Sequence, residues 1–353
     1  MKASLSNLIS QAVNRPASPT RLVGSTGHIF SKLTNLEGIT DINEVAIKAG
    51  FDFTAVKRPQ FWFEDDNGMM GAENFTTVHE YQELFAKLRV NPEMVSISNR
   101  DANGSYLGTT GINYGVAQFK DVLAFTQHLV DEGEANYIHG GVTHGGARAF
   151  LVMKTAEFIE ITPGDRVECY FYVSTAHNGK SSLSLIPAPL RLLNNTVLLV
   201  PGISVMKFKH SKHVNFHITQ ATKTIGKIRQ YFDEFRDSFD KLATTALTDH
   251  IENTYLKLLY PDGKEKATRA ENVRDKIKDI RRTEKSLQLP SVKNTLLGAY
   301  FAVCQYNDHY TNIRKTNGRD ELSARIESRM SVNGTVAKKK AEALAFAFKL
   351  NSI

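Results

Sequence analysis

The most regular pattern of apolar positions in the chain lies between Asn215 and Ala246. Apolar residues recur there at alternating spacings of three and four, the period of an amphipathic α-helix with one buried stripe. The pattern predicts a single helix of about 30 residues, roughly 45 Å long, with Asn215 as its N-cap. A helix of this length would span a sheet or pack on a neighbouring subunit. The stripe consists of Ile218, Ala221, Ile225, Ile228, Phe232, Phe235, Phe239, Leu242 and Ala246.

Shorter apolar runs separated by turn residues predict a series of strands before this helix. Asn178-Gly179 is typical of a tight β-hairpin, and Asp101-Ala102-Asn103-Gly104 has the composition of another hairpin turn. Asn194-Asn195 and Pro201-Gly202 indicate further turns. The predicted strands cover residues 61–63, 94–98, 106–108, 148–154, 166–174, 181–187, 189–193, 197–200 and 204–209.

Helical periodicity appears on both sides of the strand-rich segment. It predicts helices over residues 77–88 and 116–130, and a mainly helical region after residue 246. The first 60 residues, interrupted by prolines, are expected to form an irregular arm with one short helix at most. The glycine-rich stretch over residues 140–146 is expected to be a flexible loop.

These elements together predict an α+β protein. We expect a mixed or antiparallel sheet with hairpins, packed on the long helix and followed by a helical C-terminal region. The predicted divisions are an N-terminal arm over residues 1–60, a core over residues 61–245 and the helical region over residues 246–353.

Composition limits the cellular setting. The chain has 353 residues and 41% hydrophobic positions, enough for a substantial core. Cys169 and Cys304 are far apart, which favours a reducing compartment and excludes a zinc site built on cysteines. No apolar run reaches the ~18 residues of a membrane span, and Met1 to Ser10 lack the apolar centre of a signal peptide. We therefore expect a cytoplasmic protein with no membrane partner.

Charge is distributed unevenly along the chain, although the net charge is +7. Residues 1–145 contain 11 Lys and Arg against 16 Asp and Glu, a net charge of −5. Residues 146–353 contain 33 against 21, a net charge of +12. The basic half is therefore the candidate for contact with a polyanion.

The sixty-four residues from Cys169 to Phe232 contain no Asp or Glu, but eight Lys and Arg. Burial of strands would explain missing carboxylates, but it would remove the cations as well. A surface that faces a phosphate backbone explains both features. We therefore predict nucleic-acid contacts by the basic residues of this stretch and of the strand before it. The predicted contact residues are Arg148, Lys154, Lys180, Arg191, Lys207, Lys209, His210, Lys212, Lys223, Lys227 and Arg229.

Motifs for covalent chemistry are weak. Residues 174–181 are one residue short of a phosphate-binding loop, and a predicted strand follows them where a helix is required. No Gly-x-Ser-x-Gly elbow is present. The sequence therefore offers no positive case for an enzyme, and we expect no cofactor. The exception to consider is His210, His213 and His217, whose spacing would suit a metal on a helix, although the neighbouring lysines would repel a cation.

An ordered series of short motifs between residues 60 and 245 resembles a family encoded by phages and plasmids, catalogued as a domain of unknown function and often called "phage/plasmid-like protein". Asn178 and Asn194-Asn195 depart from the residues usual in that family, which argues against a catalytic role for them. The series comprises Gly146-Ala147-Arg148-Ala149-Phe150, Gly164-Asp165-Arg166-Val167, residues 170–173, residues 177–182, Arg191 with Asn194-Asn195-Thr196, and Lys207-Phe208-Lys209-His210.

The family resemblance implies a phage or plasmid origin. By fold analogy it also suggests similarity to the Red-beta, Erf, RecT and Rad single-strand annealing proteins. We therefore expect a single-stranded-DNA-binding protein, with RNA as an alternative ligand, that promotes annealing and recombination as a ring or filament of identical subunits. Two other hypotheses stay open: a non-enzymatic interaction or host-modulating factor, and a metal-dependent enzyme built on the histidine cluster.

Overall fold

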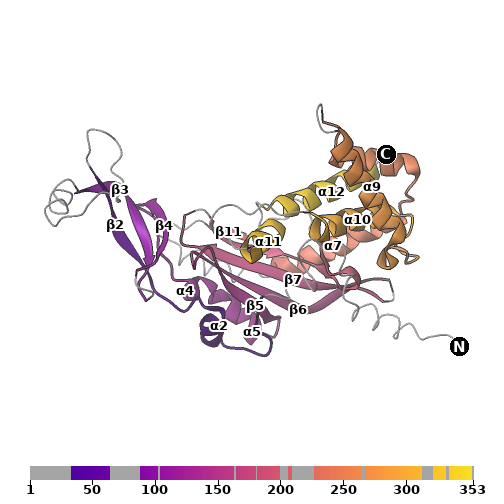
Figure 1. Ribbon diagram of the computed structural model, residues 1–353. Helices are drawn as coiled ribbons and strands as arrows, with labels where there is room; N and C mark the ends of the chain where they lie inside the picture. The colour runs from indigo at the N-terminus through magenta and orange to yellow at the C-terminus, as the bar shows by residue number, and fades with distance from the viewer. Residues whose placement is uncertain are drawn as a thin grey trace.

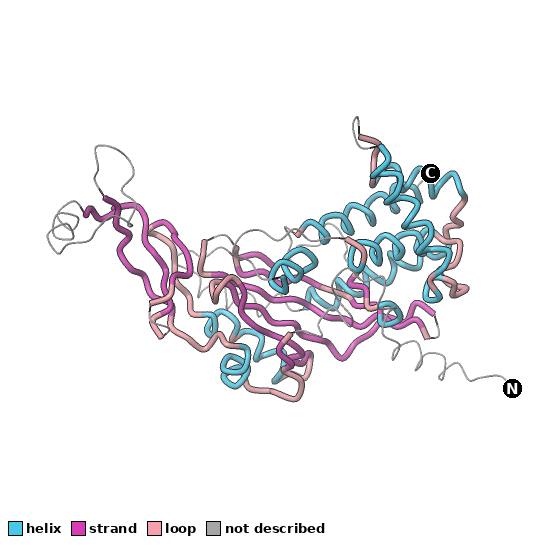
Figure 2. Tube along the Cα trace, in the orientation of Figure 1, coloured by secondary structure: helices cyan, strands magenta, loops and turns pink. Residues whose placement is uncertain are grey.

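The computed structural model combines a large antiparallel sheet, a small projecting sheet and a group of C-terminal helices (Figures 1 and 2). The structure describes residues 33–63, 88–101, 104–162, 164–179, 181–198, 206–208, 226–263, 267–311, 321–330 and 334–351. The α+β class predicted from the sequence is confirmed.

The main sheet of the described residues has eight strands, all paired in antiparallel fashion. β6 (Arg148–Thr162) and β7 (Asp165–Ala176) are the long central strands. The sheet runs from β1 at one edge to β11 at the other, and β9 and β10 extend it beside the end of β7. The remaining strands are β1 (Thr34–Asn35), β5 (Ala135–Thr143), β8 (Leu183–Pro187), β9 (Leu190–Arg191), β10 (Thr196–Val197) and β11 (Met206–Phe208).

Alternation along β6 and β7 explains why both faces of the sheet are apolar. Leu151 and Phe171 belong to a core shared with helices α2, α4, α5 and α7. Val152 and Tyr172 point the other way and join a second core with residues of α11 and α12. The bounds of these helices are α2 Ile42–Ala49, α4 Phe119–Leu123, α5 Phe125–Asp131, α7 Gly226–Thr244, α11 Glu321–Met330 and α12 Thr335–Asn351.

A smaller sheet of three described strands projects from one end of the main sheet (Figure 1). β2 (Ala55–Phe63), β3 (Leu88–Asn99) and β4 (Tyr106–Gly111) pair in sequence order. A cluster that includes Ile97 and Ala147 joins its base to the body. The predicted hairpin between β3 and β4 is confirmed.

The C-terminal helices pack around α10 (Leu296–His309), which is buried over almost its entire length. This helix is apolar on all sides, as expected for the centre of a helical group. Thr295 caps its N-terminus by accepting a hydrogen bond from the Gly298 backbone amide at 3.1 Å. α9 (Ala267–Thr283), α12 and α7 pack directly on it, and α8 (Asp249–Leu259) packs on α12.

Two predicted features differ from the structure. Residues 33–60 are not an arm, because the apolar stripe of α2 packs into the main core and β1 pairs with β5. Gly140 and Gly141 do not form a flexible loop but lie in β5. A Cβ atom at Gly140 would approach the side chain of Leu36 to 2.7 Å, so glycine is required by close packing rather than by flexibility.

The helical predictions agree in part. The stretch over residues 116–130 forms two short helices, α4 and α5, instead of one. α7 retains the predicted apolar stripe, in which Phe235, Phe239 and Leu242 are buried, and it ends at Thr244. It packs on β6 and α10, as expected of a helix that spans a sheet. Residues 77–87 of the predicted helix and the first residues of the long helix lie outside the described residues, and Leu88 begins β3.

Candidate nucleic-acid interface and a pocket among the C-terminal helices

The predicted contact residues separate into three groups. Arg148, Lys154 and Arg191 are described with their side chains. Lys207 lies on the edge strand β11, and Lys227 and Arg229 lie in the first turn of α7. The predicted residues Lys180, Lys209, His210, Lys212 and Lys223 lie outside the described part of the chain, together with His213 and His217.

Arg191 is a structural residue in this fold. Its side chain is fully buried, and the guanidinium donates two hydrogen bonds to Asp165, at 2.8 and 2.7 Å. It also donates to the Ser286 carbonyl at 2.7 Å and lies over the ring of Phe301, 4.5 Å from its centroid. Every one of these partners would have to be released before Arg191 could reach a phosphate. We therefore remove it from the interface predicted from the sequence.

Arg148 and Lys154 are also engaged within the fold. Arg148 is buried, and Lys154 forms an ion pair with Glu168 at 2.7 Å. Asp165 and Glu168 precede the carboxylate-free stretch by only a few residues. Antiparallel pairing of β7 with β9 places these two carboxylates close to side chains of the carboxylate-free stretch. In this pairing Glu168 lies opposite Leu190, and Val167 lies opposite Arg191. A gap in carboxylates along the sequence is therefore only partly a gap in space.

A second set of buried charges joins β10 to the C-terminal helices. Asp308 of α10 pairs with Lys340 of α12 at 2.5 Å and with Arg329 of α11 at 3.6 Å. The same carboxylate accepts a hydrogen bond from the Val197 amide at 3.0 Å, and Lys340 donates to the Val197 carbonyl at 2.6 Å. We call Asp165, Arg191, Asp308, Arg329 and Lys340 the buried charge network.

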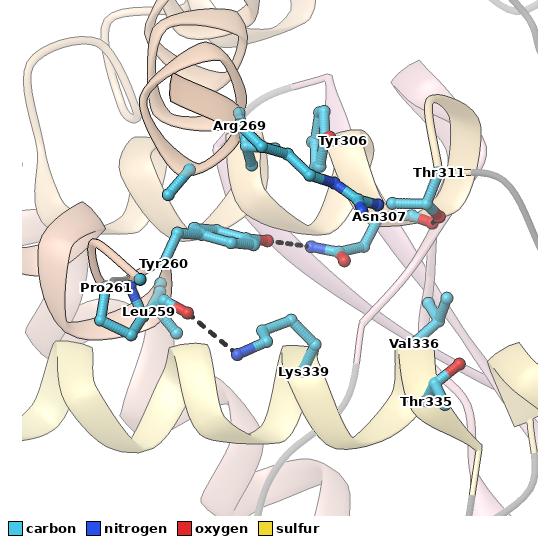
Figure 3. Close-up of a pocket in the computed structure, with 13 residues that line it drawn as sticks. Leu259, Tyr260, Pro261, Arg269, Tyr306, Asn307, Thr311, Thr335, Val336 and Lys339 are labelled. Carbon is cyan, nitrogen blue, oxygen red and sulfur yellow. Dashed lines mark hydrogen bonds between the residues drawn. The ribbon is translucent and has the colours of Figure 1, made fainter. Parts of the chain in front are cut away.

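An open pocket lies on the same group of helices, between α8, α9, α10 and α12 (Figure 3). Its volume is about 480 Å³, within the usual range for small-ligand sites. The rings of Tyr260 and Tyr306 form two of its walls and stand nearly perpendicular, with centroids 6.3 Å apart. Val273 adds an apolar surface, and Arg269 and Lys339 contribute positive charge.

The two cations of the pocket differ in their surroundings. Lys339 donates to the Leu259 carbonyl at 3.0 Å and pairs with Glu342 at 2.5 Å, so its charge is partly neutralised. Arg269 is exposed and forms no ion pair with any described residue. Its charge lowers the pKa of Tyr306, but burial of that phenol has the larger effect and raises the pKa overall.

The polar groups at the base of the pocket are held in fixed orientations. Asn307 is 4% exposed, and its amide nitrogen donates to the Tyr260 hydroxyl and to the Val303 carbonyl, both at 2.8 Å. Arg274 donates to the Tyr260 carbonyl at 2.6 Å and pairs with Asp262. Burial raises the pKa of Tyr260, so its hydroxyl keeps its proton near neutral pH.

Sequence reasoning missed this pocket. Its residues come from four helices and the loops that follow two of them, and they share no motif. The only local signal is Tyr306 and Tyr310, spaced four apart and therefore on one face of a helix. The rings of these two residues are nearly parallel, with centroids 6.3 Å apart.

The described residues lack two kinds of feature. None of their helices is both long and apolar enough to cross a bilayer. They contain no group of three or more His, Cys, Asp or Glu side chains arranged to hold a metal ion. His210, His213 and His217 lie outside the described residues.

Fold and site together define an α+β protein with a two-faced antiparallel sheet and a helical pocket. The model of the family described as "Domain of unknown function (DUF932)" matches residues 106–330, more than half of the chain. The chain therefore belongs to the DUF932 family. No curated protein and no solved structure matches it.

Proposed function

We propose that this protein binds single-stranded DNA and promotes strand annealing as a homo-oligomer. The observation that carries the proposal is the position of the carboxylate-free stretch in the fold. β8 and β11 lie side by side at one edge of the main sheet, and neither strand contains an acidic residue. The charge gap noted in the sequence thus coincides with one sheet edge in space, with Lys207 on the outermost described strand.

The edge differs from the interior of the same stretch. Arg191 has carboxylates in reach because β9 pairs with β7, whereas β11 pairs with Leu183, Ser184 and Leu185 of β8. Lys207 lies opposite Ser184. Cations on an edge whose two outermost described strands contain no acidic residue suit the neutralisation of a phosphate backbone. Such contacts ignore sequence and leave bases free to pair, as annealing requires.

The helix α7 extends the same charge pattern. Lys227 and Arg229 lie in its first turn, and its first acidic residue is Asp233. We propose Lys207, Lys227 and Arg229 as backbone contacts, together with Lys180, Lys209, His210, Lys212 and Lys223 outside the described residues. Arg148, Lys154 and Arg191 are excluded because the fold uses them.

Salt dependence tests this proposal. Binding of a labelled oligo(dT) should be measured by fluorescence anisotropy over a range of salt concentrations, with the logarithm of affinity falling linearly with the logarithm of salt. Lys207→Ala and Lys227→Ala should each reduce the slope by about 0.7, the value expected for one lost contact to a single strand. Lys338→Ala, which removes an exposed lysine from α12, is the matched control and should leave the slope unchanged.

Two results would contradict the proposal: no binding at low salt, or binding with no dependence on salt. Sedimentation with and without the oligonucleotide tests the oligomeric part. An annealing protein of this kind should be multimeric, or become so when DNA is added.

A further inference from the structure

The pocket between α8, α9, α10 and α12 combines features that select one kind of ligand. Its walls are aromatic and aliphatic, which favours a flat, largely apolar group. Its positive charge at Arg269 has no carboxylate partner among the described residues. An unpaired guanidinium beside aromatic rings is suited to a ligand that is both planar and anionic.

The base of the pocket adds a requirement for hydrogen bonding. Both protons of the Asn307 amide are used, by Tyr260 and by Val303, which fixes the direction of the side chain. Among the described residues, the Asn307 side-chain oxygen accepts no hydrogen bond, and the Tyr260 hydroxyl accepts from Asn307 but donates to no group. The pocket can therefore offer a ligand one acceptor next to one donor.

An adjacent donor and acceptor are the common feature of the Watson–Crick edges of the four nucleobases. Each base presents such a pair, so the Asn307 oxygen and the Tyr260 hydroxyl can satisfy any of the four. They cannot be satisfied by a plain aromatic ring, which would leave both polar groups buried without partners.

We propose that this pocket binds a nucleoside monophosphate unit. The base stacks on the Tyr306 ring and bonds with its edge to Asn307 and Tyr260. The phosphate is bound chiefly by Arg269, because Lys339 is already paired with Glu342. The site does not depend on the proposed sheet-edge interface, and it would stand if that proposal failed.

The site is organised before any ligand arrives. Arg274 donates to the Tyr260 carbonyl, Asn307 donates to its hydroxyl, and the Lys339 ammonium lies over its ring, 5.3 Å from the centroid. The Tyr306 ring lies parallel to the Tyr310 ring. The Lys276 ammonium lies over the Tyr310 ring, 5.4 Å from its centroid. Groups held in this way lose little conformational entropy on binding.

Isothermal titration of the full chain with three probes tests the proposal. Adenosine 5′-monophosphate contains both parts of the ligand, adenosine lacks the phosphate, and phenyl phosphate lacks the base edge. The nucleotide should bind about 10-fold more tightly than either of the others, the effect of one charged or two neutral hydrogen bonds. If the nucleotide does not bind, or if all three probes bind equally, the proposal is overturned.

Two variants assign the roles. Arg269→Ala should weaken nucleotide binding by about 10-fold and leave adenosine binding unchanged. Tyr260→Phe keeps the ring and should reduce the preference for the nucleotide over phenyl phosphate by about 5-fold. The matched control is Arg282→Ala, on the same helix as Arg269 and 59% exposed, which should change neither value. If Arg269→Ala and Arg282→Ala lose nucleotide affinity equally, the loss reflects the net charge of the protein, and the proposed site is overturned.

A competition experiment distinguishes two sources of the bound nucleotide unit, a base of a bound DNA strand and a free nucleotide. If oligo(dA) displaces the nucleotide and its binding is weakened by Arg269→Ala, the pocket holds a base of a bound strand. If the nucleotide remains bound in the presence of saturating oligo(dA), the pocket serves a free nucleotide. Both results support the site. Loss of oligonucleotide binding with retention of nucleotide binding would overturn the annealing function alone.

Discussion

The buried charge network and the helical pocket contain the same kinds of residue in the same part of the molecule. Each combines arginine, lysine and aromatic rings around α10. In the network, Arg191 and Lys340 are fully buried, and each has a carboxylate within hydrogen-bonding distance. In the pocket, Arg269 is exposed and has no carboxylate partner among the described residues.

The difference between the network and the pocket shows how to distinguish a cation that stabilises the fold from a cation that is available to bind a ligand. Removing a guanidinium from water costs several kcal/mol, so a buried one must be paired. A cation left for a ligand has to stay partly hydrated and unpaired until the ligand arrives. Charge and composition alone do not distinguish these cases, whereas the distance to the nearest carboxylate does.

The largest effect is expected at Arg191. Arg191→Ala would leave Asp165 buried without a partner and should lower the free energy of unfolding by about 3–5 kcal/mol. Urea denaturation measures this value. Replacing both residues, as Arg191→Met with Asp165→Leu, should restore much of the loss. A stability close to the unmodified protein in the single variant would show that Arg191 is not a structural cation.

A slightly smaller effect is expected at Lys340 of α12. Lys340→Met retains the length of the side chain but removes the charge next to Asp308, and should cost about 3 kcal/mol. Lys338 lies two residues away on the same helix and is exposed, so Lys338→Met should change stability by less than about 0.5 kcal/mol. Similar losses in the two variants would remove the distinction between buried and exposed cations on this helix.

The pH dependence of the free energy of unfolding tests burial around α10 through the neutral thiol of Cys304. Burial raises the pKa of the Cys304 thiol from 9.0 to about 12. Above pH 9 the unfolded chain therefore loses a proton that the folded protein retains, and the free energy of unfolding should fall by about 1.4 kcal/mol per pH unit for this thiol.

Urea titrations between about pH 8 and about pH 10.5 measure this slope. Cys304→Ala should reduce the slope by the contribution of one thiol, whatever its effect on stability at neutral pH. Cys169, whose pKa burial also raises to about 12, remains in that variant as an internal reference. An unchanged slope would mean that Cys304 ionises in the folded protein.

The smallest effect on stability is expected at Arg269. Arg269→Ala removes an exposed side chain that forms no ion pair with a described residue, and should change the free energy of unfolding by less than about 0.5 kcal/mol. Its effect should instead appear in nucleotide binding. A loss of stability comparable to that of Arg191→Ala would place Arg269 among the structural cations.

The sequence by itself determined most of the local structure. Alternating apolar residues and the turn at Asn178-Gly179, where Gly179 has a φ of 69°, predicted β7, β8 and the hairpin that joins them. The heptad stripe predicted α7 and the face that it buries. These features depend on residues close together in the chain, so their spacing alone carries the information.

The tertiary structure alone decided the environment of each cation. Strand pairing brings Asp165 to Arg191, and helix packing brings Asp308 to the Val197 amide, 111 residues away in sequence. The pocket likewise assembles from four helices. Pairing, burial and enclosure depend on contacts between distant segments, so the count of carboxylates along the chain could not reveal which cations were already neutralised.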